Sequence, residues 1–115
     1  MSRDTDLELP EEMSEQPTNF ANANPEVWNA YAELGSACSD AGPLDRDTQR
    51  LVKLALAIAS ESEGATHSHV QRALDQDIPP EALKHVAALS IPTIGFPKAM
   101  AALSWIEDVT DEESG

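Results

Sequence analysis

One segment near the middle of this 115-residue chain is apolar on almost every side, and it limits the folds open to the protein. Its apolar residues fall at the i, i+3, i+4, i+7 spacing of one helical face, and others fill the remaining sides. They are Leu51, Val52, Leu54, Ala55, Leu56, Ile58 and Ala59. A helix of this kind needs cover from other elements all round, so we predict a central helix from Asp45 to about Ser60.

The neighbouring segments also have the sequence pattern of helices. Asn24 is a good N-cap and Pro25 suits a first helical position, so a helix is expected from Pro25 to about Asp40. Further helices are predicted over about 64–76, from residue 80 onward, and over about 96–109, with 91–97 as an interruption. No segment shows the alternation of apolar and polar residues that is typical of a strand. We therefore predict an all-α protein with a single domain of about five to six helices. Because a chain of this length has a modest core, we also expect an oligomer, in which contacts between copies bury further apolar surface.

The charge is strongly acidic and concentrated at the two ends of the chain. Asp and Glu number 21 against 7 Lys and Arg, which gives a net charge of −14. Such a chain repels nucleic acid and anionic membranes, so neither is expected as a partner. The acidic residues suggest a disordered N-terminal tail over 1–23, a helical domain over 24–109 and an acidic C-terminal tail over 110–115.

The sequence also indicates a compartment. Cys38 is the only cysteine, so no disulfide can form within the chain, as suits a reducing environment. No secretory signal is recognisable, and the longest apolar run, Leu54 to Ala59, is too short to span a bilayer. We expect a cytoplasmic protein.

Two histidines near the start of the third predicted helix are the main candidates for chemistry. Residues two apart on a helix point about 200° away from each other, so His67 and His69 cannot bind one ion from the same helix. His67 lies one turn after Glu63, which is the spacing of a helix cap contact, of an acid/base pair or of two metal ligands. All three readings stay open, and a metal would need further ligands from elsewhere.

His69 lies on a different face of that helix, among small residues. Ser62, Ala65 and Ala73 leave room there either for a pocket or for a closely packed helix. His69 is thus either a packed, hydrogen-bonded side chain or a proton carrier at the wall of a small cavity. The third histidine, His85, has the pattern of an ordinary amphipathic helix around it and is expected to be structural.

Several short motifs, in order, resemble the carboxymuconolactone decarboxylase / alkyl hydroperoxidase D superfamily from Pro25 to about Asp108. An "LD" before the central helix, a histidine-led "HVQRAL" and a Pro-Glu helix start are similar to its motifs, and so is a "TIGFPKAMAAL" near the C-terminus. These segments are Leu44-Asp45, His69 to Leu74, Pro80-Glu81 and Thr93 to Leu103. The resemblance implies a helical AhpD-like domain that assembles as a trimer or hexamer.

In the redox members of that superfamily an acid, a CxxC pair and a histidine form the site. A gap-free comparison places Arg50, Ser62, Ala65 and His69 at those positions, so only the histidine is retained. Thiol peroxidase chemistry needs a reactive thiolate and a resolving thiol. A serine and an alanine supply neither, so this activity is not expected.

The decarboxylase members also lack the redox pair, and their resemblance implies cofactor-free acid/base chemistry on a small organic acid or lactone. His69 would be the proton carrier with Glu63 and His67 as an auxiliary pair, and Arg50 or Arg72 would bind a carboxylate; Lys53 is a further available cation. No cofactor or resident metal is expected on this reading. The alternatives are a non-catalytic oligomeric or binding protein, and a metal-binding protein that completes Glu63 and His67 across a subunit interface.

Overall fold

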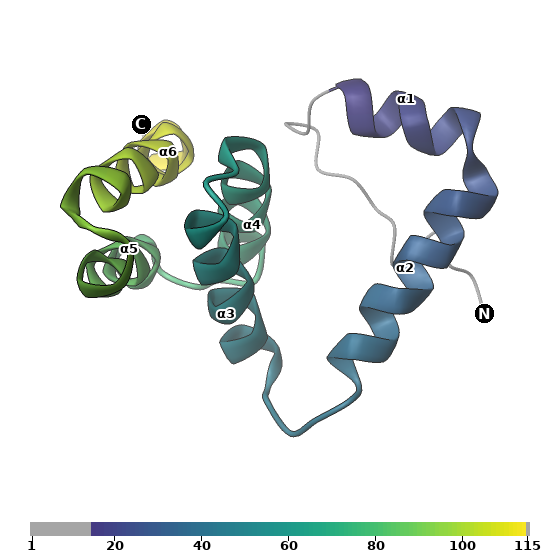
Figure 1. Cartoon of the computed structure of the whole chain (residues 1–115), viewed down its shortest axis with the longest axis horizontal. Helices are drawn as coiled ribbons and strands as arrows, with labels where there is room; N and C mark the ends of the chain where they lie inside the picture. The colour runs from purple at the N-terminus through teal and green to yellow at the C-terminus, as the bar shows by residue number, and fades with distance from the viewer. Residues whose placement is uncertain (1–14, 115) are drawn as a thin grey trace. The chain divides into compact units, whose positions relative to one another are not determined.

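The structure, a computed structural model, describes residues 15–114, and this range contains six α-helices and no strand. The helices are α1 (Glu15–Ala23), α2 (Pro25–Ser39), α3 (Arg46–Ala59), α4 (Glu63–Asp75), α5 (Pro80–Ile94) and α6 (Phe96–Ser114) (Figure 1). The predicted all-α class is therefore confirmed. The helices belong to two compact units, which divide between Leu44 and Asp45.

The first unit contains α1 and α2, which contact each other. Sequence reasoning missed α1, because it assigned residues 15–23 to a disordered tail; the rest of that predicted tail, residues 1–14, lies outside the described residues. Pro17 falls in the first turn of α1, where a missing N–H is harmless, so it does not prevent the helix. The predicted start of α2 at Pro25 is confirmed, but the Asn24 side chain bonds back to the Phe20 carbonyl at 3.3 Å rather than capping α2.

The second unit packs α3 against α4 and α5, and α6 against α4 and α5. Figure 1 shows α3 beside α4 and α5 beside α6. Each helix contributes fully buried side chains to one shared core. These residues are Leu54, Ile58, Val70, Ala73, Leu83, Ala87, Ala102 and Ile106.

The helix α3 is not buried on every side within this unit, contrary to the prediction. Leu54, Ala57 and Ile58 are buried, whereas Val52 is 44% exposed and Leu56 is 61% exposed. Since only α4 and α5 pack on α3 in this unit, its remaining side has no helix to cover it. The helix is apolar on most sides, as its sequence indicates, but the other helices of the second unit cover only part of that apolar surface.

Two helix ends also differ from the prediction. α5 continues through Pro92 and ends only at Gly95, whose φ of +96° suits a glycine. α6 runs on to Ser114, beyond the predicted end at Val109, and Thr110 in this last part of the helix is only 1% exposed. Among the residues described, no helix is long and apolar enough to cross a membrane.

Candidate functional site

The connection between α3 and α4 forms one wall of a shallow, open pocket in the second unit. Its volume is about 230 Å³, and the residues that line it are Lys53, Leu56, Ala57, Ser60, Ser62, Ala65 and His69. The connection is tight because Glu61 adopts the left-handed conformation, with φ of 58°. Ser62 then caps α4 by accepting a hydrogen bond from the Ala65 N–H at 3.1 Å. The cap fixes where α4 begins and so where His69 lies, two turns later.

A chain of hydrogen bonds holds the His69 imidazole. Arg50 Nη1 lies 2.8 Å from His69 Nδ1, and Arg50 Nε donates to Gln76 Oε1 at 2.8 Å. Gln76 Nε2 in turn donates to Asp47 Oδ1 at 3.0 Å. A guanidinium has only donors, so His69 Nδ1 must accept this bond. The neutral ring therefore carries its proton on Nε2.

The same surroundings keep the imidazole neutral. Burial and, after it, the positive charges of Arg50, Arg72 and Lys53 together lower the pKa of His69 to about 4. Burial also lowers the pKa of Arg50, with the charges of Arg72 and Arg46 acting in the same sense. At neutral pH, His69 is thus an uncharged donor with one fixed tautomer.

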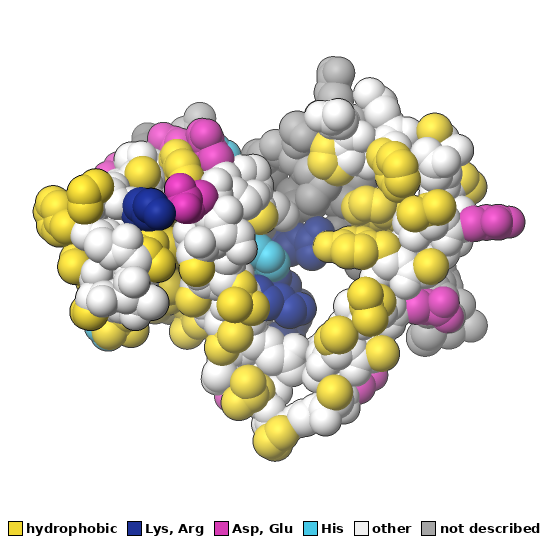
Figure 2. Space-filling model, in the orientation of Figure 1, with side chains coloured by type: hydrophobic (Ala, Val, Ile, Leu, Met, Phe, Trp, Pro, Cys, Tyr) yellow, Lys and Arg dark blue, Asp and Glu magenta, His cyan; other side chains and the backbone are white. Residues whose placement is uncertain are grey.

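Four basic residues gather here in a chain that is otherwise acidic. Arg50, Arg72 and Lys53 act on His69, and Arg46 acts on Arg50, so four of the seven Lys and Arg residues belong to one neighbourhood. Figure 2 shows Lys and Arg side chains gathered around a histidine. Because the net charge is −14, this local excess of positive charge stands out from the rest of the chain.

The structure brings together three positions of the redox motif without their thiols. Ser62, Ala65 and His69 all line the pocket, as the alignment with the redox members implies. Arg50, at the position of the acid, contacts His69 directly. A carboxylate there would favour a protonated imidazole, whereas a guanidinium disfavours it, so the electrostatic effect on His69 is reversed.

Not all of the predicted site residues line the pocket. Arg50 and Arg72 act on His69 but are not among the lining residues, whereas Lys53 is. His85 is exposed on α5 and does not line the pocket. Gln76, which orients Arg50, was missed, because nothing in the sequence shows that the end of α4 meets the start of α3.

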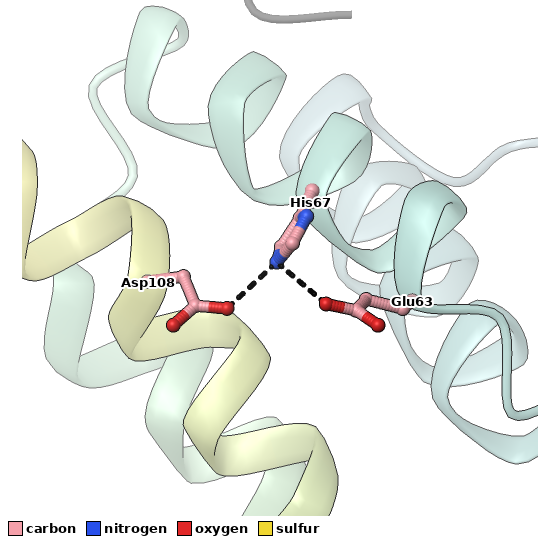
Figure 3. A group of neighbouring side chains, drawn as sticks. All are labelled: Glu63, His67 and Asp108. Carbon is pink, nitrogen blue, oxygen red and sulfur yellow. Dashed lines mark hydrogen bonds and ion pairs between the residues drawn. The ribbon is translucent and has the colours of Figure 1, made fainter. Parts of the chain in front are cut away.

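Glu63 and His67 lie away from the pocket and meet a third residue, Asp108 of α6 (Figure 3). His67 Nε2 is 3.0 Å from Asp108 Oδ2 and 3.9 Å from Glu63 Oε2. The predicted proximity of Glu63 and His67 is present, but Asp108 comes 41 residues after His67 and no local spacing indicated it. This cluster and the His69 pocket are therefore two separate places on the second unit.

The fold and the His69 pocket define the class of protein. The model of the carboxymuconolactone decarboxylase family matches residues 25–108, which is most of the chain. The chain belongs to this family, as the motifs had indicated, and it is a member without a CxxC pair because it has a single cysteine. No curated protein and no solved structure matches the chain significantly.

Proposed function

We propose that this chain binds a small organic acid or lactone acid in the pocket between α3 and α4, and that neutral His69 acts on it as a hydrogen-bond donor, in place of the proton carrier expected from the sequence. The observation that carries the proposal is that three basic residues, Arg50, Arg72 and Lys53, act on a neutral histidine in a chain of net charge −14. Localised positive charge attracts an anionic ligand and raises its local concentration. The family name, carboxymuconolactone decarboxylase, fits a substrate of this type.

In this proposal His69 is a fixed hydrogen-bond donor. Its Nδ1 accepts from Arg50, so Nε2–H is the group left for a ligand oxygen. A neutral imidazole with a lowered pKa is suited to polarise a carbonyl group. Loss of CO2 from a lactone acid leaves an electron pair that spreads onto an adjacent carbonyl oxygen, and a fixed donor stabilises that charge. The carbanion then takes its proton from water, which can enter the open pocket, and His69 stays neutral throughout.

Lys53 is the proposed carboxylate-binding cation, since it lines the same pocket as His69. Arg50 had been expected to bind the carboxylate; we now propose it as a positioning residue that fixes the His69 tautomer through its bond to Nδ1. Arg72 contributes positive charge to the same region. Glu63 and His67 are assigned no part in this pocket, because they lie with Asp108 at the other site.

A ligand panel tests the proposal. Small monocarboxylates, dicarboxylates and lactone acids are titrated into the full chain while the side-chain NMR signals of the three histidines are followed. We expect at least one acid to move the His69 signal alone, and Lys53→Met to weaken its binding roughly tenfold, since one charged hydrogen bond is lost. The control Lys84→Met, on a lysine that pairs with Asp111, should bind as the wild type does.

The same experiment separates catalysis from binding alone. An acid that binds at His69 and releases CO2 at a rate lowered by His69→Gln supports the enzymatic form. Binding without turnover of any bound acid supports the alternative, a non-catalytic binding protein that kept the family fold. If no acid moves the His69 signal, or if Lys53→Met binds as tightly as the wild type, the proposed function is wrong.

We also propose self-association, as a trimer or hexamer, and a reducing cytoplasmic setting for the single exposed thiol of Cys38. The support for self-association is the apolar surface that each unit leaves uncovered. Figure 2 shows hydrophobic side chains gathered over α2 and others over α3. Val27, Tyr31 and Leu34 on α2 are all more than half exposed.

A further inference from the structure

The cluster of Glu63, His67 and Asp108 brings three metal-ligating side chains together on the surface of the second unit. Two come from adjacent turns of α4 and one comes from α6, and Figure 3 shows the three side chains pointing toward one another. One ligand atom from each residue lies within 4.8 Å of the other two. The two helices that carry them are fixed by the buried core, since Val70 and Ile106 are both fully buried.

The two carboxylates of the cluster converge on one ring nitrogen. Both carboxylates approach the same ring atom, His67 Nε2, and a neutral imidazole has at most one proton there. Asp108 Oδ2 at 3.0 Å accepts that proton, whereas Glu63 Oε2 at 3.9 Å is beyond hydrogen-bond distance. Two carboxylates thus lie beside one ring nitrogen, and only one of them can accept its proton. A divalent cation in place of the proton would bind all three atoms and neutralise both charges.

The distances suit a small metal ion. Ligand atoms about 2.1 Å from a tetrahedral zinc ion are separated from each other by about 3.4 Å. The two separations from His67 Nε2, 3.0 and 3.9 Å, lie on either side of that value, so small side-chain rotations would complete the geometry. The side chains are 35% (His67), 57% (Glu63) and 55% (Asp108) exposed, so an ion can reach them and keep water at the remaining position.

We propose that Glu63, His67 and Asp108 bind a divalent transition-metal ion, of which Zn²⁺ fits best. One imidazole nitrogen and two carboxylate oxygens form a donor set that zinc accepts, whereas Mg²⁺ and Ca²⁺ favour oxygen ligands alone. All three ligands come from one chain, so no subunit interface is needed to complete the site. This site departs from the sequence-based expectation that no metal is bound. It is independent of the proposed chemistry at His69.

The test uses full-length protein without a histidine tag, stripped of metal with a chelator and titrated with ZnCl₂. The chain has three histidines, so side-chain NMR reports each of them. We expect the His67 signals to shift on zinc addition while those of His69 and His85 stay in place. Calorimetry should show one zinc ion per chain, and Mg²⁺ at the same concentration should leave the His67 signals unchanged.

Variants identify the ligands. Asp108→Asn and Glu63→Gln should each weaken zinc binding by roughly tenfold or more, because each removes a charged ligand. Asp111→Asn is the matched control: it removes a carboxylate one turn further along α6 that pairs with Lys84 at 3.6 Å, and it should bind zinc as the wild type does. Glu63 is an exposed residue in the first turn of α4, so Glu63→Gln is expected to fold normally even if Asp108→Asn does not.

Three results would overturn the proposal. Zinc that shifts no histidine signal, or only that of His85, shows that the cluster binds no metal. Equal zinc affinities of wild type and Glu63→Gln, in a variant with wild-type circular dichroism, show that the carboxylate is not a ligand. Equal losses of affinity in Asp108→Asn and Asp111→Asn indicate a diffuse effect of acidic surface charge rather than a built site.

Discussion

Arg50 determines the chemical character of His69 more than any other single residue. It replaces the acid of the redox members and bonds to His69 Nδ1 at 2.8 Å. The imidazole therefore has a proton on Nε2 and a pKa of about 4, where burial is the largest cause and the charge of Arg50 follows. A general base at neutral pH would need surroundings that raise the pKa of the imidazole rather than lower it. These features make His69 a hydrogen-bond donor at neutral pH.

The first prediction concerns this contact. Arg50→Gln removes the positive charge but keeps a side chain that can hydrogen bond, so the pKa of His69 should rise above that in the wild type. It should stay below 6.5, because burial is the larger cause and remains. Side-chain NMR titration measures the change. Arg46→Gln is the control, because the charge of Arg46 lowers the pKa of Arg50 but is not among the causes that lower the pKa of His69. Equal shifts of the His69 pKa in both variants would argue against a specific contact.

The second prediction links His69 to stability. The folded-state pKa of about 4 lies below the ordinary value of 6.5, so between these pH values the unfolded chain binds more protons at His69 than the folded chain does. The contribution of neutral His69 to the free energy of unfolding is thus complete above pH 6.5, and it is lost as the pH falls toward 4.

Wild type and His69→Gln, unfolded by urea across that pH range, isolate this effect, because the carboxylates that both proteins share cancel in the difference. The stability advantage of the wild type should shrink by roughly 2 kcal/mol between pH 6.5 and pH 4, a figure reduced for the partial exposure of the ring. Parallel stability curves for the two proteins would contradict the low pKa.

At the scale of the elements, most of the helices could be predicted because their signals are local. Asp45 caps α3 by accepting from the Thr48 N–H at 2.8 Å, and hydrogen bonding with the Thr48 side chain, followed by this backbone bond, lowers the pKa of Asp45. The Gly42-Pro43 stop and the Pro80 start likewise act within a few residues. The extension of α6 to Ser114 was not predicted, because the acidic C-terminal residues gave no sign that Thr110 is buried.

The third prediction belongs to the start of α4. Ser62 occupies the first cysteine position of the redox motif but here caps the helix through the Ala65 N–H. Ser62→Ala should lower the free energy of unfolding by about 1 kcal/mol, and Ser62→Asp should restore it, since aspartate is an equally good cap. Urea unfolding measures both. Ser60→Ala, at an exposed position that caps no helix N-terminus, should change stability little.

At the scale of the whole molecule, the chain has apolar surface that its units do not bury and a net charge that opposes assembly. Val27, Tyr31 and Leu34 lie exposed on α2, while Trp28 packs its ring 5.7 Å from that of Tyr31. Burying such a surface between copies would release ordered water and stabilise an oligomer. The charge of −14 on each copy acts against this, and salt weakens that repulsion.

The fourth prediction follows from these two effects. Light scattering should find a trimer or hexamer, and the oligomer should dissociate at a higher protein concentration in low salt than in physiological salt. Leu34→Glu should shift the assembly toward monomer. Leu89→Glu, at a similarly exposed leucine on α5, should not. A monomer at high protein concentration under all salt conditions would contradict self-association.

The candidate sites could be predicted only in part. The sequence identified His69 and the pair of Glu63 and His67, because helical spacing assigns them to different faces. It did not identify Gln76 or Asp108, since these reach the sites through the packing of α4 on α3 and on α6. A contact between residues far apart in the chain leaves no local pattern, so the partners of a residue are harder to predict than the residue itself.

The protonation of His69 in the wild-type protein tests the central claim most directly. Side-chain ¹⁵N NMR reports both the tautomer and the pKa of each histidine in one titration. We predict that His69 carries its proton on Nε2 at neutral pH and titrates near pH 4. A His69 that titrates near pH 6.5, or that carries its proton on Nδ1, would contradict the hydrogen bond from Arg50 and the neutral donor built on it.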